Sequence, residues 1–534
     1  MHRRFVFLAL LVAPSLASGA VPESAPQPTA ATEVDAAARL AERIDQRLDE
    51  RRRAAGVKPA AAIDDAAFLR RVSLDLIGRI PTVYESRTYI ADKSADKDRK
   101  LVRRLLASPL YARHWATLWR RRWIPEADAP QFEFLVDDVD DWLAAKLHRR
   151  TSYREITAEL LNGPSGKSKI PGDESGARAF LVAGEDKPEN LAAHATRAFL
   201  GINLDCAQCH DHPFARWTRD EFWQTAAFFA RPTPVEPTTD EKGSPAARFT
   251  VVIPDTERRV SAKFLSDPRV AWPTTVDRDT GRRTLAEWIT SPQNPYFARH
   301  AANYVWLNLF GNGLVLPLDD LSVAAPQGDP QLLAELADEL IAADFDVARI
   351  VEACVLTKSY RLGHYGATSA KSDAARPSPI DSLLFAEMPI RALTGEQLYD
   401  SIRTAAGLSA VRDDLARREA LLERRTWGRQ FLSERAATAE RSILQALKLM
   451  NGPTVAAAGD PDLGSLITTA VDGPLATPED RVNLIFAATL NRAPTADERA
   501  AALAHLAAGK AAPRRAVSDL FWALVNTAEF NTNH

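Results

Sequence analysis

Apolar residues recur every three to four positions along most of the chain, the spacing that places them on one face of an α-helix. In residues 34–53, for example, Leu40, Ile44 and Leu48 lie four positions apart. A Ser or Thr followed three residues later by Glu can satisfy the free N–H groups of a first helical turn, so this pair marks a helix start. Such pairs predict helix starts at Thr82, Ser152, Thr218 and Thr495.

The second half of the chain continues this helical pattern. Its apolar stripes predict helices over residues 285–291, 295–310, 331–342, 347–360, 394–405, 441–451, 478–491, 495–508 and 514–530. Two stretches rich in small and polar residues, 163–187 and 363–380, are predicted to be loops. No repeat of 20–50 residues is visible, so the helices do not predict a solenoid.

One segment departs from the helical pattern. Residues 249–253 and 260–264 are rich in β-branched and aromatic residues, which is typical of paired strands. They lie within residues 231–282, where prolines are frequent. We therefore predict a mainly α fold with two helical lobes, 34–230 and 283–534, joined by a proline-rich linker at 231–282 that carries a small β insertion.

The first residues are typical of a secretory signal peptide. A basic start precedes an apolar stretch at residues 5–13, which is too short to span a bilayer. Small residues at positions 18–20 predict cleavage of residues 1–20, so that the mature chain begins near Val21. Residues 21–33 are rich in Pro, Ala and Thr and predict a disordered tether. We expect an exported protein, periplasmic or extracellular, with no transmembrane segment after cleavage.

Composition and charge narrow the function classes. The 534 residues are too many for one hydrophobic core and indicate two or more domains. The formal net charge of −3 does not indicate a nucleic-acid-binding protein, because such a protein needs a basic domain. No nucleophile elbow, phosphate loop or dinucleotide fingerprint occurs. If the protein were a hydrolase, Asp319-Asp320, near Asn303, would be its candidate acidic pair. Adjacent carboxylates in a loop after Pro317, however, more often form a turn.

The run Cys206-Ala207-Gln208-Cys209-His210 has the spacing of a c-type haem attachment site. In such a site the two thiols bond to the haem vinyl groups, and the adjacent His ligates the iron from one face. A predicted helix at 188–199 precedes the run, and the helix starting at Thr218 follows it. The sequence therefore predicts haem c on a short connection between two helices.

Other readings of the motif remain open. Cys206 and Cys209 form a disulfide in an oxidising compartment in one of them, and a redox-active pair in another. In a third they join His212 on a zinc or other soft metal, although a zinc site needs a fourth ligand and no second Cys-x-x-Cys or His-x-x-x-His occurs in the chain. The third cysteine, Cys354, lies in an apolar helical run and is predicted to be a buried, inert thiol.

The surroundings of a haem are less clearly marked than its attachment. Aromatic residues follow the motif and suit either a macrocycle wall or an ordinary core, the second being commoner: Trp217, Phe222, Trp223, Phe228 and Phe229. Candidates for the opposite iron ligand are Met388, Met450, His194 and His534. His212 is too close to His210 in the sequence to reach the far face of the haem.

Several runs are similar to a known family. In the first half they are residues 68–78 (FLRRVSLDLIG), 105–111 (LLASPLY) and 206–214 (CAQCHDHPF), with Trp217 beyond them. In the second half they are residues 294–299 (NPYFAR), 310–315 (FGNGLV), 445–451 (QALKLMN) and 522–530 (WALVNTAEF). These runs resemble the planctomycete family of exported proteins in which a cytochrome-like domain precedes a conserved C-terminal domain of unknown function.

The resemblance covers most of residues 35–534 and implies a cytochrome-like protein without an established activity. The chain departs from the family pattern at Tyr304, where the family tends to have Arg, and at Asp329, where it tends to have His. Any role of that Arg or His is therefore not carried over. We expect haem binding and electron transfer with a redox partner protein. The alternative is an extracellular helical scaffold or interaction protein whose Cys206 and Cys209 form a disulfide or metal site.

Overall fold

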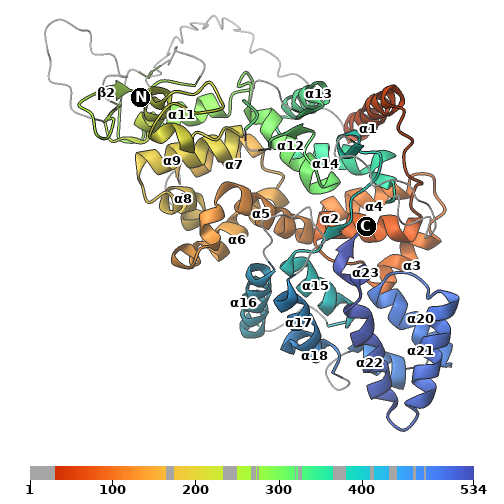
Figure 1. The fold of residues 1–534 in the computed structure, drawn as a ribbon. Helices are drawn as coiled ribbons and strands as arrows, with labels where there is room; N and C mark the ends of the chain where they lie inside the picture. Colours follow the sequence, from red (N-terminus) through yellow and green to blue (C-terminus); the bar gives the residue numbers. More distant parts are fainter. Residues whose placement is uncertain are drawn as a thin grey trace, which may run out of the picture.

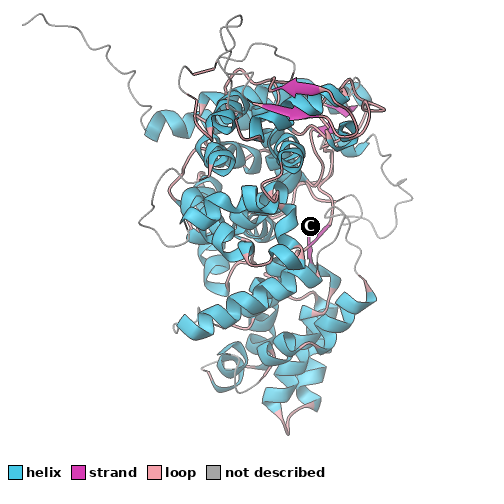
Figure 2. Ribbon diagram, turned by 90° about the vertical axis from the view of Figure 1, so that its left-hand side faces the viewer, coloured by secondary structure: helices cyan, strands magenta, loops and turns pink. Residues whose placement is uncertain are grey.

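The computed structural model is mainly α-helical, as predicted, with strands confined to small antiparallel pairs (Figure 2). It describes residues 30–163, 173–232, 249–265, 272–273, 276–318, 320–322, 327–364, 381–408, 414–431, 442–460, 465–473 and 477–534. The predicted signal peptide and most of the tether lie outside these residues. None of the helices in the described ranges is long and apolar enough to cross a membrane.

Two hydrophobic cores organise the helices. The larger core extends from Ala37 to Met388, and the smaller one from Leu393 to Phe530 with Leu74 and Ile80 added. Around the larger core are α1 (Ala30–Ala55), α2 (Asp65–Ile77), α3 (Val83–Ala91), α4 (Lys97–Leu106), α5 (Pro109–Trp123), α6 (Leu135–His148), α7 (Tyr153–Asn162), α8 (Asp173–Ala183), α9 (Pro188–Ala195), α10 (Arg219–Ala226), α11 (Thr280–Ile289), α12 (Phe297–Phe310), α13 (Pro330–Ala342) and α14 (Val347–Val355).

The helices from residue 395 onward form a second lobe, which lies below the first in Figure 1. They are α15 (Gly395–Ala405), α16 (Asp414–Gln430), α17 (Ile443–Asn451), α18 (Pro453–Ala458), α19 (Ser465–Asp472), α20 (Pro478–Thr489), α21 (Ala496–Ala508), α22 (Pro513–Val525) and α23 (Ala528–Asn531). The packing thus divides the chain near residue 390, whereas the predicted join lay at 231–282. The cause is that α11 packs on α7, so that residues on both sides of the predicted join share the larger core.

The predicted strand pair is present within that segment. Strands β1 (Thr250–Val252) and β2 (Arg259–Ser261) are antiparallel, with Val251 opposite Val260. The other pairs are β3 (Val315–Leu316) with β4 (Gln327–Gly328), and β5 (Arg391–Ala392) with β6 (Thr532–Asn533). The last pair places the final residues of the chain beside the start of the second lobe.

Capping residues define the helix starts that the sequence predicted. Thr82, Thr218 and Thr495 each form a complete capping box with the Glu three residues later. The predicted box at Ser152 has only one half, since its hydroxyl accepts from the Glu155 N–H at 3.5 Å. Helix α2 ends at Gly78, whose φ of 69° suits glycine. A Cβ there would lie 2.7 Å from the ring of His114, which packs closely against this turn.

Interactions between side chains join the two lobes. Asp75 of α2 is buried and accepts from Arg391 at 2.9 Å and from Asn533 Nδ2 at 2.8 Å, which ties both β5 and β6 to the first lobe. Arg121 of α5 pairs with buried Glu396 of α15 at 2.5 Å. Because these charged groups are paired where little water reaches them, they favour one arrangement of the lobes.

Candidate functional site

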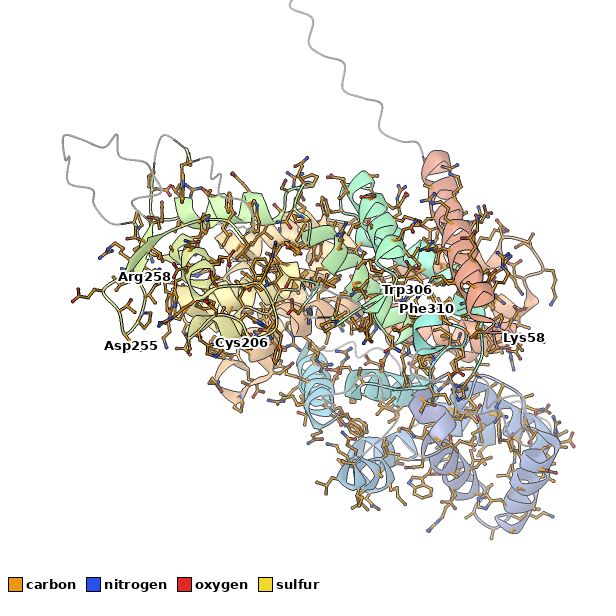
Figure 3. The ribbon with its side chains drawn as sticks, turned by 45° about the horizontal axis from the view of Figure 1, so that its top comes forward. Lys58, Cys206, Asp255, Arg258, Trp306 and Phe310 are labelled. Atoms are coloured by element: carbon orange, nitrogen blue, oxygen red, sulfur yellow. The ribbon has the colours of Figure 1, made fainter. Side chains whose placement is uncertain are left out.

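The cysteine motif lies on a short 3₁₀ turn, Asp205–Gln208, that connects α9 to α10. Cys206, Cys209 and His210 are exposed, and both cysteines are free thiols. Figure 3 shows Cys206 at the end of the molecule that carries the β1–β2 hairpin, toward Asp255 and Arg258. The structure therefore brings together the three residues of the predicted haem attachment site on a surface that a ligand can reach.

The chain enters this turn through a short π-helical segment, Thr196–Leu200, where the sequence predicted a regular α-helix to residue 199. The hydroxyl of Thr196 donates to the carbonyls of Ala192 and Ala193, and such bonding competes with the regular helical pattern. Gly201 then ends the segment with a φ of 60°. The wide turn and the glycine together redirect the chain toward the motif.

Hydrogen bonds hold the motif turn against α10. Ala207 is fully buried, and its N–H donates to the Leu204 carbonyl at 2.8 Å. Trp223 of α10 donates from Nε1 to the Gln208 carbonyl at 3.1 Å. On the entry side, Asp205 pairs with Arg197 at 2.9 Å. The turn is thus fixed from both sides of the two cysteines while their side chains face outward.

The ring of His210 has a defined tautomer. Its Nδ1 lies 2.8 Å from the backbone carbonyl oxygen of Asp211. A carbonyl can only accept a hydrogen bond, so Nδ1 carries the proton. The lone pair of the neutral ring then lies on Nε2, the atom that a metal-ligating His commonly uses when Nδ1–H is bonded to a carbonyl.

His212 has a different task in this loop. Its Nδ1 accepts from the N–H groups of Phe214 at 3.1 Å and Ala215 at 2.9 Å, and its own N–H donates to the Trp217 carbonyl at 2.8 Å. Because Nδ1 is an acceptor, the neutral ring carries its proton on Nε2 and has no lone pair left there. His212 therefore shapes the loop, and no group of three metal-ligating side chains is found in the part of the chain that the structure describes.

The aromatic residues that follow the motif belong to the core. Trp217, Phe222, Trp223, Phe228 and Phe229 are all buried. The Nε1 of Trp217 donates to Ser322 at 2.8 Å, and Phe228 stacks on Phe264 with ring centroids 5.0 Å apart. These rings hold the motif loop on the larger core and do not form an open wall beside the two cysteines.

Each of the four candidates for the second iron ligand is paired with another side chain, is buried in the core, or lies in another part of the fold. His194 of α9 faces Glu126 at 3.2 Å, and burial lowers the pKa of its ring. Met388 is buried in the larger core, Met450 is exposed on α17 of the second lobe, and His534 ends the chain beside Arg71. Of the four, His194 lies near the motif turn, close enough for the Asp205 carboxylate to act on its charge, but it is paired with Glu126.

A buried pair that the sequence did not reveal lies beneath the entry to the motif. His300 of α12 is fully buried, and a Cβ on Gly201 would lie 2.5 Å from its ring. Arg122 of α5 donates to His300 Nε2 at 2.7 Å, so this ring is neutral, and burial holds its pKa well below the usual value. Arg122 and His300 are 178 positions apart, and no local pattern could have linked them.

The remaining predicted residues have structural roles. Cys354 is fully buried, and burial raises the pKa of its thiol, as expected for an inert cysteine. Asp320 accepts from the N–H of Ser322 at 3.2 Å, which makes it a turn former, while Asp319 lies outside the described residues. Asn303 is buried and bonds the backbone of Val315 at 2.8 Å. These contacts give no support to a hydrolase.

The residues present fit the attachment of a c-type haem but not its enclosure. Two free, exposed thiols precede a His whose Nε2 lone pair is unused by the protein. Apart from Phe214, which is exposed, the aromatic side chains that follow the motif point into the core, so one face of an attached macrocycle would be largely open to solvent.

Comparison with known families gives two matches in succession. Residues 43–233 match a model named PSCyt2, described as a protein of unknown function (DUF1549). Residues 281–414 match a model named PSD1, described as a protein of unknown function (DUF1553). The first match contains the cysteine motif, and the second ends at the start of α16. Comparisons with curated proteins and with solved structures found no match.

Proposed function

We propose that this chain is an exported c-type haem protein that transfers electrons. The premise is its family: the chain carries a cytochrome-type domain followed by a C-terminal domain of unknown function, the domain order of the planctomycete family. Cys206 and Cys209 hold the haem covalently. Each S–H adds across one vinyl double bond, so that a C–S bond forms and the hydrogen goes to the other vinyl carbon. His210 is the iron ligand on the protein side.

One observation carries this proposal: the prepared state of His210. Its Nδ1–H is bonded to the Asp211 carbonyl at 2.8 Å, which orients the ring and leaves the Nε2 lone pair for the iron. The turn that presents it is fixed by Trp223 and by the Asp205–Arg197 ion pair. Little reorganisation of the chain is then needed when the thiols react.

The same geometry predicts how accessible an attached haem would be to other molecules. A c-type haem supplies one-electron chemistry when it is bound. Because the thiols and His210 are exposed, the group would be held at the surface, where a redox partner can approach closely. His194 lies near the motif turn but is paired with Glu126, so an attached haem would be open to an exogenous ligand such as carbon monoxide.

Visible spectroscopy of protein exported by a host with haem-attachment machinery tests the proposal. The wild type should show a Soret band that shifts on reduction and again on addition of carbon monoxide. Replacing both cysteines, Cys206→Ser with Cys209→Ser, should remove the band, and His210→Ala should keep the covalent group but change its spectrum. A colourless wild type, obtained while a known c-type cytochrome matures in the same host, would refute the proposal.

A second candidate is the helical scaffold or interaction protein. The observation that favours it is the inward packing of the aromatic residues from Trp217 to Phe229, since these rings then support the loop and not a macrocycle. In this alternative Cys206 and Cys209 form a disulfide after export. Intact mass of the exported chain distinguishes the two candidates, because a disulfide lowers the mass by two hydrogens and a haem raises it.

A further inference from the structure

The exposed side of α17 is apolar. Ile443 is 79% exposed, Leu444 78%, Leu447 48% and Met450 45%, and Leu449 is the buried residue of this helix. A surface helix usually turns its apolar stripe toward the core. In α17 most of the large apolar side chains face solvent instead. We call Ile443, Leu444, Leu447 and Met450 the α17 stripe.

A tryptophan of α22 extends this apolar surface. Trp522 of α22 is 39% exposed, and its Nε1 donates to the Met450 carbonyl at 2.9 Å, so its ring lies at the C-terminal end of the stripe. The stripe and Trp522 together form an exposed apolar patch, and such a patch on a monomer commonly marks an interaction site. Figure 1 shows α17 and α18 on the flank of the second lobe.

The charge of the patch suits a second copy of the same chain. Lys448 is the one charged residue of α17, and its ammonium group lies 5.5 Å from the ring centroid of Trp427. Desolvation lowers its pKa, which agrees with a side chain turned toward the protein. The four residues of the α17 stripe and Trp522 themselves carry no charge. Two copies can meet there without the like-charge repulsion that opposes the self-association of a charged surface.

The adjoining segment of the chain is unsuited to cover the patch. Residues 432–441 (LSERAATAER) precede α17 and lie outside the described residues. Leu432 is the one large apolar residue among them, while four of the ten are charged. A segment of this composition supplies too little apolar surface to bury four large side chains and an indole.

We propose that the α17 stripe is the contact of a two-fold symmetric dimer in which the α17 helices run antiparallel. Leu447 lies three residues from Leu444 and three from Met450, so it sits at the middle of the stripe. With the two-fold axis at Leu447, Leu444 of each copy packs against the partner's Met450, and each Leu447 meets the partner's Leu447. Such an isologous contact uses the same patch twice and closes. Because one short helix of each copy supplies most of this contact, we expect a weak dimer that forms only as the protein concentration rises.

Cross-linking at the axis tests the geometry. In a Cys206→Ser, Cys209→Ser background, Leu447→Cys should form a disulfide-linked dimer under mild oxidation, because the two introduced thiols face each other. Tyr84→Cys on α3 is the matched control, since Tyr84 is 77% exposed but lies away from the patch. Cys354 is buried and does not compete. Equal cross-linking at both positions, or none at Leu447→Cys, would overturn the proposed axis.

Sedimentation of the same Cys206→Ser, Cys209→Ser background tests the association itself. The background protein should pass from monomer to dimer as its concentration rises, and Leu444→Glu with Leu447→Glu should weaken the dimer at least tenfold. Both side chains are exposed, so circular dichroism and the melting temperature of the monomer should change little. A protein that stays monomeric up to about 100 μM, as it would if a different protein occupies the stripe, overturns the proposal. So does a dimer that the two substitutions leave intact.

Discussion

The indole Nε1 of Trp223 donates to the backbone carbonyl of Gln208 at 3.1 Å, and this bond fastens the cysteine turn to the helix that follows it. Trp223 is buried, whereas Cys206 and Cys209 on either side of the bonded peptide are exposed. The core thus fixes the backbone of the motif and leaves its reactive atoms to the solvent. A site of this kind is prepared for attachment of a ligand from outside.

Replacing that tryptophan should loosen the turn. In Trp223→Phe the partly buried Gln208 carbonyl loses its donor, and loss of such a hydrogen bond costs about 1 kcal/mol. We expect faster amide hydrogen exchange over residues 205–210 than in the wild type. Trp522→Phe, which removes an indole bond in the second lobe, is the control and should leave that exchange unchanged. Unaltered exchange in Trp223→Phe would show that the bond does not hold the turn.

The three cysteines should differ sharply in reactivity when no haem is attached. Cys206 and Cys209 are exposed free thiols, while Cys354 is fully buried and its thiol pKa is raised by burial. A polar thiol reagent should therefore modify two thiols rapidly in the native reduced protein and the third only on unfolding. Rapid modification at Cys354, read by peptide mass mapping, would contradict the packing of α14.

Removing Asp75 should strongly destabilise the protein. Its carboxylate accepts from Arg391, from the Tyr360 hydroxyl at 2.7 Å and from Asn533, so Asp75→Ala leaves a largely buried guanidinium without its partner. Loss of one member of a buried ion pair costs about 3–5 kcal/mol. Urea unfolding should show this loss. Asp497→Ala on the exposed face of α21 should change stability by no more than about 0.5 kcal/mol.

Acid should weaken the fold through buried histidines. Burial lowers the pKa of His114 to about 3, with Arg424 and Arg121 adding to this and Glu396 opposing it. Below pH 6.5 the unfolded chain binds a proton on this ring while the folded chain does not, so the unfolding free energy falls as the pH drops from 6.5 toward 3. Between pH 7 and pH 5 this one group contributes about 2 kcal/mol.

The variant His114→Gln isolates that contribution. Its overall stability is expected to fall because His114 packs against Gly78, so the difference between its stabilities at pH 7 and pH 5 is the informative quantity. That difference should be smaller than in the wild type by about 2 kcal/mol. An identical pH dependence in both proteins would mean that His114 is protonated in the folded state.

Local patterns in the sequence were enough to predict much of the fold. The capping boxes at Thr82, Thr218 and Thr495 and the strand pair at 249–264 were found because each depends on residues close together in the chain. The division of the cores near residue 390 was not found. It depends on α11 packing against α7, a tertiary contact that leaves no periodic trace in either segment.

In the candidate site too, features that depend on neighbouring residues were predicted, and features that depend on tertiary packing were not. The motif and its place between helices followed from spacing alone, and the inert Cys354 from its apolar run. The sequence could not decide whether His212 forms the loop or binds a metal, because that depends on which ring nitrogen meets the N–H groups of Phe214 and Ala215. The π-helical turn before the motif and the His300–Arg122 pair beneath it likewise arise from packing between distant segments.

The most direct test of the proposed function is the intact mass of the exported chain under denaturing conditions. Covalent attachment through Cys206 and Cys209 predicts that the mature chain exceeds its sequence mass by one haem, and that the Cys206→Ser, Cys209→Ser variant does not. A wild type that has the sequence mass, or that mass less two hydrogens, from a host that matures other c-type cytochromes would contradict haem attachment.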